Sequence, residues 1–181
     1  MERTLWTVCV VLLLCCFLTP RVCLAGEKSK EVRTVDRVDL ERYVGLWYEI
    51  ARYPNWFQKK CAREVTATYT LLENGRVEVL NSCRTQSGEL AKAKGKAKVV
   101  DKKTFARLRV TFFWPFYGDY WILDLDPEYR FAVVGEPSRK YLWILSRTPR
   151  MEDAEYQAIL ERLKVNGFDT GRLVKTEQSA P

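Results

Sequence analysis

Gly45-Leu46-Trp47-Tyr48-Glu49-Ile50-Ala51-Arg52 is the stretch of the sequence that decides the fold. Gly45 lets the backbone enter at a tight angle, and the indole of Trp47 then has to be buried. Because side chains alternate along a strand, one face is expected to hold Trp47, Glu49, Ala51 and Tyr53. Both faces carry bulky groups, so both are expected to be covered. An ordinary buried strand fits this pattern as well, and the rest of the chain has to decide.

The composition of the 181 residues suits a single domain with a real core, since 47% are hydrophobic. The formal net charge is +7, but the basic residues are scattered rather than massed in one arm. We therefore expect a weak attraction to anionic surfaces and no nucleic-acid partner. The sequence has no histidine, which removes the commonest metal ligand and the usual general base. Catalysis, a metal site and a cofactor are accordingly not expected.

Residues 1–25 have the pattern of a secretory signal peptide. The apolar run at 5–18 is too short to span a bilayer comfortably, and small residues at 23–25 suit cleavage before Gly26. A retained membrane anchor and a bacterial lipoprotein signal are the alternatives. A lipoprotein signal needs a cysteine after its Leu-Ala-Gly box, whereas Leu24-Ala25-Gly26 is followed by Glu27. We expect an exported protein located in the periplasm, with association to the outer membrane left open.

Two cysteines, Cys61 and Cys83, lie beyond the predicted signal peptide. In an oxidising compartment a disulfide between them is expected, stabilising by about 3 kcal/mol in the chain-entropy model. Two free thiols are the alternative. A catalytic cysteine would lack a histidine partner.

Eight strands are predicted in succession, with short connections and no helix between them. Their expected ranges are 47–53, 64–73, 76–84, 93–101, 105–113, 119–126, 130–135 and 141–147. Asn74-Gly75 predicts a two-residue hairpin turn that places Cys83 opposite Thr66. The Lys-rich face of the fourth strand is expected to be solvated. A meander of this kind has to close on itself or expose its edges, which favours a barrel.

A helix is expected only after the eighth strand, at 152–166. It has one apolar stripe and ends at Gly167. The predicted fold is all-β: an eight-stranded antiparallel up-and-down barrel with one C-terminal α-helix packed outside. We expect a flexible leader at 26–37, the domain at 38–177, with a helical turn at 38–44 and a short strand at 171–175, and a tail at 178–181.

Four motifs in this order closely resemble the bacterial lipocalins (Blc-like proteins), relatives of apolipoprotein D. They are Gly45–Arg52, VTATY at 65–69, PFYG at 115–118 and YLWILSRTP at 141–149. The resemblance implies a ligand-binding calyx. It also implies that Arg147 lies across Trp47 at the closed end, a cation–π contact worth about 0.5–2 kcal/mol. Gly45, Trp47 and Arg147 are therefore predicted to be structural.

The ligand is expected near the open end of the barrel, where four connections bring aromatic and basic groups together. These are Trp56, Phe57, Lys59, Lys60, Phe112, Phe113, Trp114, Phe116, Tyr117, Arg139 and Lys140. Aromatics that fold back into the core are the alternative. The resemblance implies that Tyr117 and Trp143 approach the ligand's polar end. The predicted ligand-binding set is completed by Glu49, Ala51, Tyr53, Phe113 and Tyr141.

Glu49 needs a partner if it lies inside the barrel, because a buried carboxylate is costly unless it is paired. The sequence offers Arg107, Arg109 or water, without a choice among them.

The favoured function is non-catalytic binding, storage or transport of a fatty acid or lysophospholipid in the bacterial cell envelope, for membrane maintenance. An enzyme on a lipocalin scaffold is an alternative, although the sequence contains no Gly-x-Ser-x-Gly. A carrier of another small hydrophobic ligand, and an interaction protein with a vestigial pocket, are the others. The expected partners are the lipid and a membrane surface, with a homodimer left open.

Overall fold

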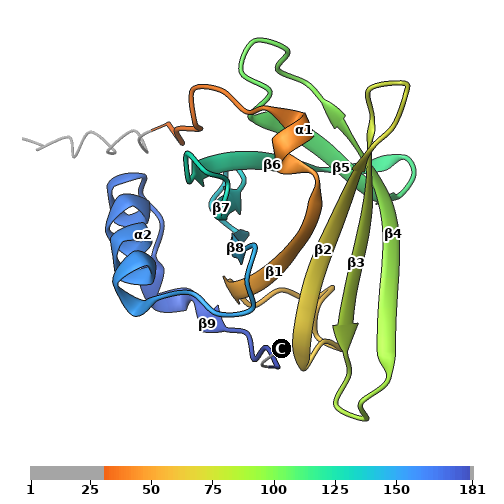
Figure 1. Ribbon diagram of the computed structural model, residues 1–181, viewed down its shortest axis with the longest axis vertical. Helices are drawn as coiled ribbons and strands as arrows, with labels where there is room; N and C mark the ends of the chain where they lie inside the picture. Colours follow the sequence, from red (N-terminus) through yellow and green to blue (C-terminus); the bar gives the residue numbers. More distant parts are fainter. Residues whose placement is uncertain (1–30, 180–181) are drawn as a thin grey trace, which may run out of the picture.

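Eight antiparallel strands close into a barrel in the computed structural model, which describes residues 31–179 (Figure 1). Closure occurs because β1 pairs with β8 on one side and with β2 on the other. The strands are β1 (Gly45–Arg52), β2 (Arg63–Leu71), β3 (Val77–Arg84), β4 (Leu90–Val99), β5 (Arg107–Phe113), β6 (Phe116–Leu125), β7 (Phe131–Gly135) and β8 (Leu142–Ser146). A short β9 (Val174–Lys175) adds to β1. The predicted barrel with one helix outside is confirmed.

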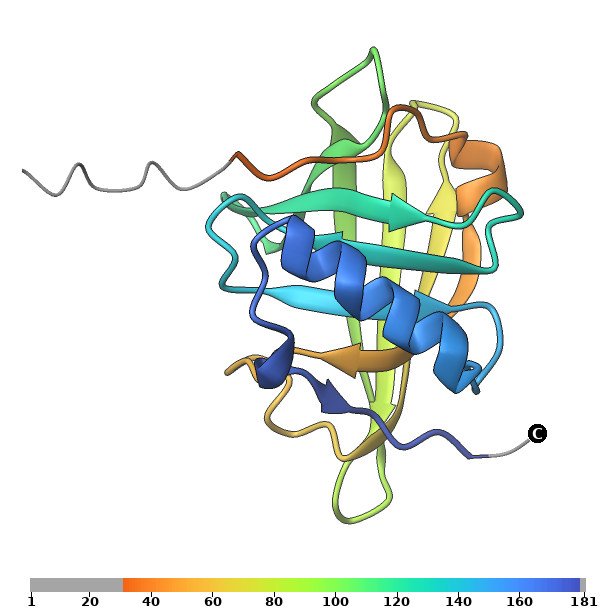
Figure 2. The same cartoon turned by 90° about the vertical axis from the view of Figure 1, so that its left-hand side faces the viewer.

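Two helices define the closed end and the covered side of the barrel. The short α1 (Leu40–Tyr43) lies at the end where β1 begins, and Asp39 caps it by accepting the amide of Glu41 at 2.9 Å. The longer α2 (Asp153–Val165) lies across strands β6 to β8 on the outside (Figure 2). It is followed by the 3₁₀ turn η1 (Thr170–Arg172).

The apolar side chains form two cores, one on each face of the sheet. The inner core fills the closed half of the barrel and includes Trp47, Tyr69, Ile122 and Val134. The outer core lies beneath α2 and includes Ile144 and Ile159. Along β8 the two sets alternate: Trp143 and Leu145 face inward, whereas Leu142 and Ile144 face the helix. The inward direction predicted for Trp143 is therefore correct.

A β-bulge at Ile50 reverses the faces of β1. Glu49 pairs with Leu145, but the next pairs are Ala51 with Ile144 and Arg52 with Trp143, so one residue of β1 is extra. Ala51 and Tyr53 consequently lie in the outer core beneath α2, not with Trp47 and Glu49. Their predicted place on the inner face is wrong.

The β2–β3 hairpin is longer than the predicted two-residue turn. Leu71 pairs with Val77, and the amide of Leu72 donates to the carbonyl of Arg76 at 2.8 Å. Of the two turn residues, only Gly75 has a positive φ, +73°, which fits a longer turn with one left-handed residue. The register therefore shifts by one, and Thr66 lies opposite Ser82 instead of Cys83.

The described residues before β1 and after β8 also pack against the barrel. Residues 31–37, predicted as a flexible leader, pack along the barrel: Val32 is buried under α2, and the amide of Val35 donates to Ile122 at 3.0 Å. After α2, the amide of Phe168 donates to Leu163 and that of Gly167 to Lys164, a Schellman ending. Within 31–179 no helix is long and apolar enough to cross a bilayer. The predicted signal peptide, 1–25, lies outside the described residues.

Candidate functional site

The inner face of the barrel differs sharply between its two halves. In the closed half, inward-facing side chains such as Val77, Val79 and Leu108 are buried. In the open half, the strand register assigns inward positions to small residues that stay partly or fully exposed: Ala67, Asn81, Ala91, Ala93 and Gly118. An inward-facing alanine that meets solvent has no side chain opposite it. Solvent therefore reaches the inner face of the open half at these positions.

The closed half retains only a small apolar cavity of about 20 Å³. Its walls come from α1 and five strands: Leu40, Tyr43, Val44, Tyr69, Val77, Val79, Ala97, Leu108, Val110 and Tyr120. A space of this size holds about one water molecule. A cavity of this size is too small for a lipid chain.

Three tyrosines form a hydroxyl chain in the floor of the barrel. The hydroxyl of Tyr43 is 2.7 Å from that of Tyr120, which donates to Tyr69 at 3.0 Å. Burial raises the pKa of Tyr43 and Tyr120 well above the ordinary value, and that of Tyr69 to about 12. All three phenols stay protonated at neutral pH, which makes the floor polar but uncharged.

Arg147 closes the far end of the barrel. Its guanidinium carbon lies 3.7 Å from the ring centroid of Trp47. Its Nη atoms donate to the carbonyls of Arg42, Tyr43, Val44 and Leu46 at 2.7–3.2 Å. Burial lowers the pKa of Arg147 from its usual value. These contacts support the predicted structural role of the Trp47–Arg147 pair.

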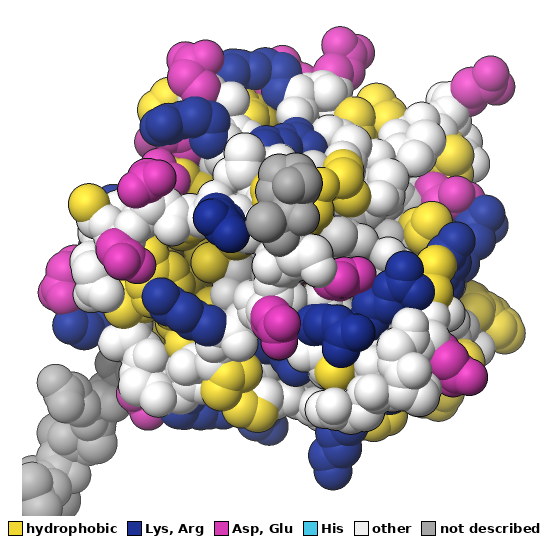
Figure 3. Space-filling view, turned by 60° about the horizontal axis from the view of Figure 1, so that its bottom comes forward, with side chains coloured by type: hydrophobic (Ala, Val, Ile, Leu, Met, Phe, Trp, Pro, Cys, Tyr) yellow, Lys and Arg dark blue, Asp and Glu magenta, His cyan; other side chains and the backbone are white. Residues whose placement is uncertain are grey.

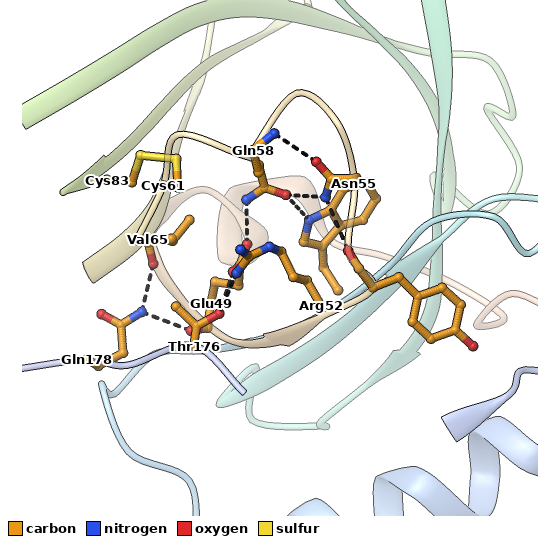
Figure 4. Close-up of polar contacts among 11 residues, drawn as sticks. Glu49, Arg52, Asn55, Gln58, Cys61, Val65, Cys83, Thr176 and Gln178 are labelled. Carbon is orange, nitrogen blue, oxygen red and sulfur yellow. Dashed lines mark hydrogen bonds and ion pairs between the residues drawn. A yellow bond between two sulfur atoms is a disulfide. The ribbon is translucent and has the colours of Figure 1, made fainter. Parts of the chain in front are cut away.

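Glu49 is a buried carboxylate of the open half, with 3% of its side chain exposed. Its Oε1 accepts from Nη1 of Arg52 at 2.8 Å and from the hydroxyl of Thr176, and its Oε2 accepts from Gln58 at 2.7 Å (Figure 4). Of the alternatives left open by the sequence, an arginine is the partner, but it is Arg52 and not Arg107 or Arg109. The β-bulge explains the choice, because it turns Arg52 to the same face as Glu49.

The β1–β2 loop reaches over this ion pair through Gln58. The Gln58 Oε1 accepts from the indole N–H of Trp143 at 2.9 Å and from Asn55 at 2.6 Å, while its Nε2 donates to Glu49. The disulfide Cys61–Cys83 ties the end of the same loop to β3 (Figure 4). The predicted disulfide is confirmed, and it fixes the loop onto the barrel.

The C-terminal segment fills the seam where β1 leaves β2. The two strands pair only from Gly45 to Tyr48, and beyond that point the side-chain amide of Gln178 donates to the carbonyls of Glu49 and Val65, each at 2.8 Å. The amide of Thr176 donates to Ile50 at 2.9 Å. Three distant parts of the chain thus meet around Glu49.

An aromatic wall stands above the ion pair. The ring of Tyr141 stacks on Trp143 with centroids 6.0 Å apart, and Phe57 lies 5.5 Å from Tyr141. Across the barrel the ring of Phe112 lies against Gly95, where an added Cβ would come within 2.8 Å of it. Trp143 and Tyr141 therefore lie at the open end, and their contact with a ligand stays a prediction.

The β5–β6 turn carries a second, outward aromatic group. Phe113, Trp114 and Phe116 are 80%, 82% and 77% exposed. Tyr117 lies on the outer face: Gly118 takes the inward position opposite Val110, and the Tyr117 ring sits 4.7 Å from the Lys98 ammonium. The predicted contact of Tyr117 with a ligand inside the barrel is therefore wrong, and Phe113 points away from the interior.

The basic groups expected around the mouth divide into two kinds. Lys59, Lys60 and Lys140 are exposed, whereas Arg139 donates to the carbonyl of Asn166 at the end of α2, at 3.1 Å. Hydrophobic side chains lie among Lys and Arg on the face that Figure 3 brings forward. Within residues 31–179 no group of acidic or cysteine side chains could hold a metal ion.

The sequence did not identify Arg52 and Gln58 as the partners of Glu49. Simple alternation places Arg52 on the face opposite Glu49, and the sequence pattern does not reveal the bulge that changes this. Gln58 lies in a loop without periodicity. Phe112, in contrast, continues the alternation of Leu108 and Val110, so the sequence predicts that its side chain faces inward.

The barrel thus has a closed end with an Arg147–Trp47 stack and aromatic side chains at its open end. The family model described as a lipocalin-like domain matches residues 38–178. The chain belongs to the lipocalin family. This lipocalin is 42% identical over 160 residues to temperature-induced lipocalin-1 of Arabidopsis thaliana, covering 84% of this chain and 86% of that one.

Two further relatives agree with the predicted resemblance. Outer membrane lipoprotein Blc of Citrobacter freundii is 41% identical over 157 residues, covering 86% of this chain and 88% of Blc. Apolipoprotein D of Mus musculus is 33% identical over 154 residues, covering 80% and 79%. Among solved structures, insecticyanin from the tobacco hornworm Manduca sexta superposes with a TM-score of 0.67 at 20% identity, covering 83% of this chain and 86% of that chain. At that identity the likeness concerns the fold alone.

Proposed function

We propose that this lipocalin is a non-catalytic carrier of a lipid amphiphile such as a fatty acid or lysophospholipid. The single observation that carries the proposal is the open half of the barrel, where inward-facing Ala67, Ala93 and Gly118 meet solvent beneath an aromatic rim. Burying a lipid chain there would contribute about 0.8 kcal/mol per CH₂. The chain would end above the tyrosine floor, with its head group near Trp143.

The rim also supports contact with a membrane surface. Phe113, Trp114 and Phe116 project from the open end, and the basic groups Lys98 and Arg109 flank Tyr117 just behind them. Exposed aromatic side chains suit the bilayer interface, and nearby cations suit anionic head groups. In this proposal the rim touches the bilayer while the lipid enters or leaves the barrel.

Export to the bacterial cell envelope, and membrane maintenance there, remain part of the proposal. The disulfide favours an oxidising compartment. Blc, a relative at about 40% identity, is an outer membrane lipoprotein. Relatives from plants and animals are matched too, so the compartment has to be tested by locating the protein in fractionated cells.

Ligand binding is tested by titrating the purified, delipidated protein with palmitate and with a lysophospholipid, following tryptophan fluorescence. Saturable binding is expected for both. Ala93→Phe places a ring in the open half and is expected to weaken binding by about tenfold or more, the equivalent of two lost methylenes. Lys92→Phe is the matched control, because Lys92 is the next residue in β4 and its side chain lies on the outer face of the barrel. Equal weakening by both variants would contradict a site inside the barrel.

Membrane contact is tested by flotation with vesicles of phosphatidylcholine, with and without phosphatidylglycerol. The double variant Phe113→Ser/Trp114→Ser is expected to float less with the anionic vesicles, while fatty-acid binding in solution is retained. Flotation equal to that of the unmodified protein would refute the role of the β5–β6 turn.

A further inference from the structure

We propose that Arg52 is the specificity-determining residue of the calyx and that its guanidinium binds the anionic oxygens of the lipid's head group, carboxylate or phosphate. The inference rests on the proposed carrier function and names the head-group class that the carrier selects. Four observations support it: the position of Arg52 in β1, its unpaired Nε–H donor, the neighbouring acceptors that are already bonded, and the contacts that hold its guanidinium in place.

The position of Arg52 is set by the bulge in β1. Opposite it in the ladder stands Trp143, the inward-facing indole of the aromatic wall. The other arginine on the inner side of the described barrel, Arg147, lies just past the end of β8, and its Nη atoms donate to backbone carbonyls near Trp47. Arg52 is therefore the guanidinium that a ligand entering the open half would meet.

Around Arg52, Glu49 and Gln58, the buried group that lacks a hydrogen-bond partner is a donor. Nη1 of Arg52 binds Glu49 and Thr176, but its Nε is buried and has no hydrogen-bond partner. Most acceptor sites, in contrast, are occupied: Glu49 receives three donors and is 3% exposed, and the Gln58 oxygen receives two. A buried donor without a partner is unfavourable until an acceptor arrives. Such a site fits an anion and disfavours a cation.

The guanidinium is held in place before any ligand binds. Glu49 and Thr176 fix one edge of it, and 14% of the Arg52 side chain remains exposed. A donor fork that is already oriented loses little freedom when it binds a carboxylate or a phosphate. The exposed Lys59 and Lys60 of the β1–β2 loop are flexible and hydrated, so they are poor candidates for this selectivity.

The test compares ligands that share one chain and differ in the head group: palmitate, palmityl phosphate and palmityl alcohol. The unmodified protein is expected to bind the two anions about tenfold or more tighter than the alcohol, the effect of one charge-assisted hydrogen bond. Arg52→Gln is expected to abolish that preference, and Arg52→Lys to restore part of it. Lys60→Gln removes one exposed positive charge and is expected to leave the preference unchanged. Circular dichroism checks that each variant is folded.

The outcomes separate the two proposals. If the alcohol binds the unmodified protein as tightly as palmitate, the role of Arg52 is refuted while the lipid carrier stands. This comparison needs no variant, so it holds even if Arg52→Gln fails to fold. If Lys60→Gln removes the preference as fully as Arg52→Gln, the surface charge and not the calyx selects the anion. If none of the three ligands binds, the carrier function itself is refuted. A preference for palmityl phosphate over palmitate would identify a phospholipid source, and the reverse a free fatty acid.

Discussion

Replacing Glu49 by glutamine is expected to destabilise the protein far more than its small chemical change suggests. Oε1 of Glu49 accepts from Arg52 at 2.8 Å, and Oε2 accepts from the Gln58 amide at 2.7 Å. A glutamine keeps one acceptor and turns the other into a donor. If its oxygen stays with Arg52, its amide nitrogen faces the Gln58 amide nitrogen, and two donors meet.

Gln58 cannot relieve this conflict by rotating its own amide. Its oxygen already accepts from Trp143 at 2.9 Å and from Asn55 at 2.6 Å, so rotation would only transfer the clash of donors to those residues. The variant therefore loses a charge-assisted bond, worth about 1.5–3 kcal/mol, and leaves a buried donor unpaired, which costs about 1–3 kcal/mol. Since such terms are not additive, a total of about 3 kcal/mol is expected.

Urea and thermal denaturation followed by circular dichroism measure this loss. A change of about 3 kcal/mol corresponds to a fall in Tm of roughly 6–12 °C for a domain of this size. Glu128→Gln is the matched control, because Glu128 forms an exposed ion pair with Arg42 at 3.9 Å and should be almost neutral. A Glu49→Gln protein as stable as Glu128→Gln would refute the described network.

Three further predictions concern the closed end, the loop and the floor of the barrel. Arg147→Met should lower the free energy of unfolding, measured by urea denaturation, by about 3–5 kcal/mol. The variant leaves backbone carbonyls at α1 without their hydrogen-bond donor and removes the stack on Trp47. Arg147→Lys should recover only part of this loss. Reduction of Cys61–Cys83, 22 residues apart, should cost about 3 kcal/mol, and a Cys61→Ser/Cys83→Ser protein should show no such response to reductant. Burial raises the pKa of Tyr69 to about 12 from the ordinary 10.0, so its contribution to stability should be complete below about pH 10 and be lost as the pH rises through 12. Tyr69→Phe should flatten that alkaline decline, and an unchanged decline would contradict the assignment.

The sequence was sufficient for the parts of the fold that depend on alternation. That Trp143 and Leu145 share one face of β8, and that α2 has one apolar stripe, follow from periods of two and 3.6. The plug of Trp47 by Arg147 was anticipated from family resemblance, and the register of β8 agreed with it. Such features need only local spacing, so the structure reproduces them.

The ligand site was predicted less well because it depends on interruptions of alternation and on distant contacts. The extra residue at Ile50 moves Ala51 and Tyr53 out of the barrel and Arg52 into it, and nothing in the local pattern marks that bulge. The face of Tyr117 depends on the register beyond a tight turn. Thr176 meets Glu49 across 127 residues of chain, a pairing that periodicity cannot reveal.

The most direct test of the lipid-carrier account is photo-crosslinking with palmitate that carries a diazirine near the end of its chain. Peptide mapping should find about one adduct per protein, on inward-facing residues of β2 to β4 such as Ala67 and Ala93, and unlabelled palmitate should suppress it. Adducts that do not saturate, or that map to the outer face beneath α2 or to the exposed β5–β6 turn, would contradict a lipid chain held inside the barrel.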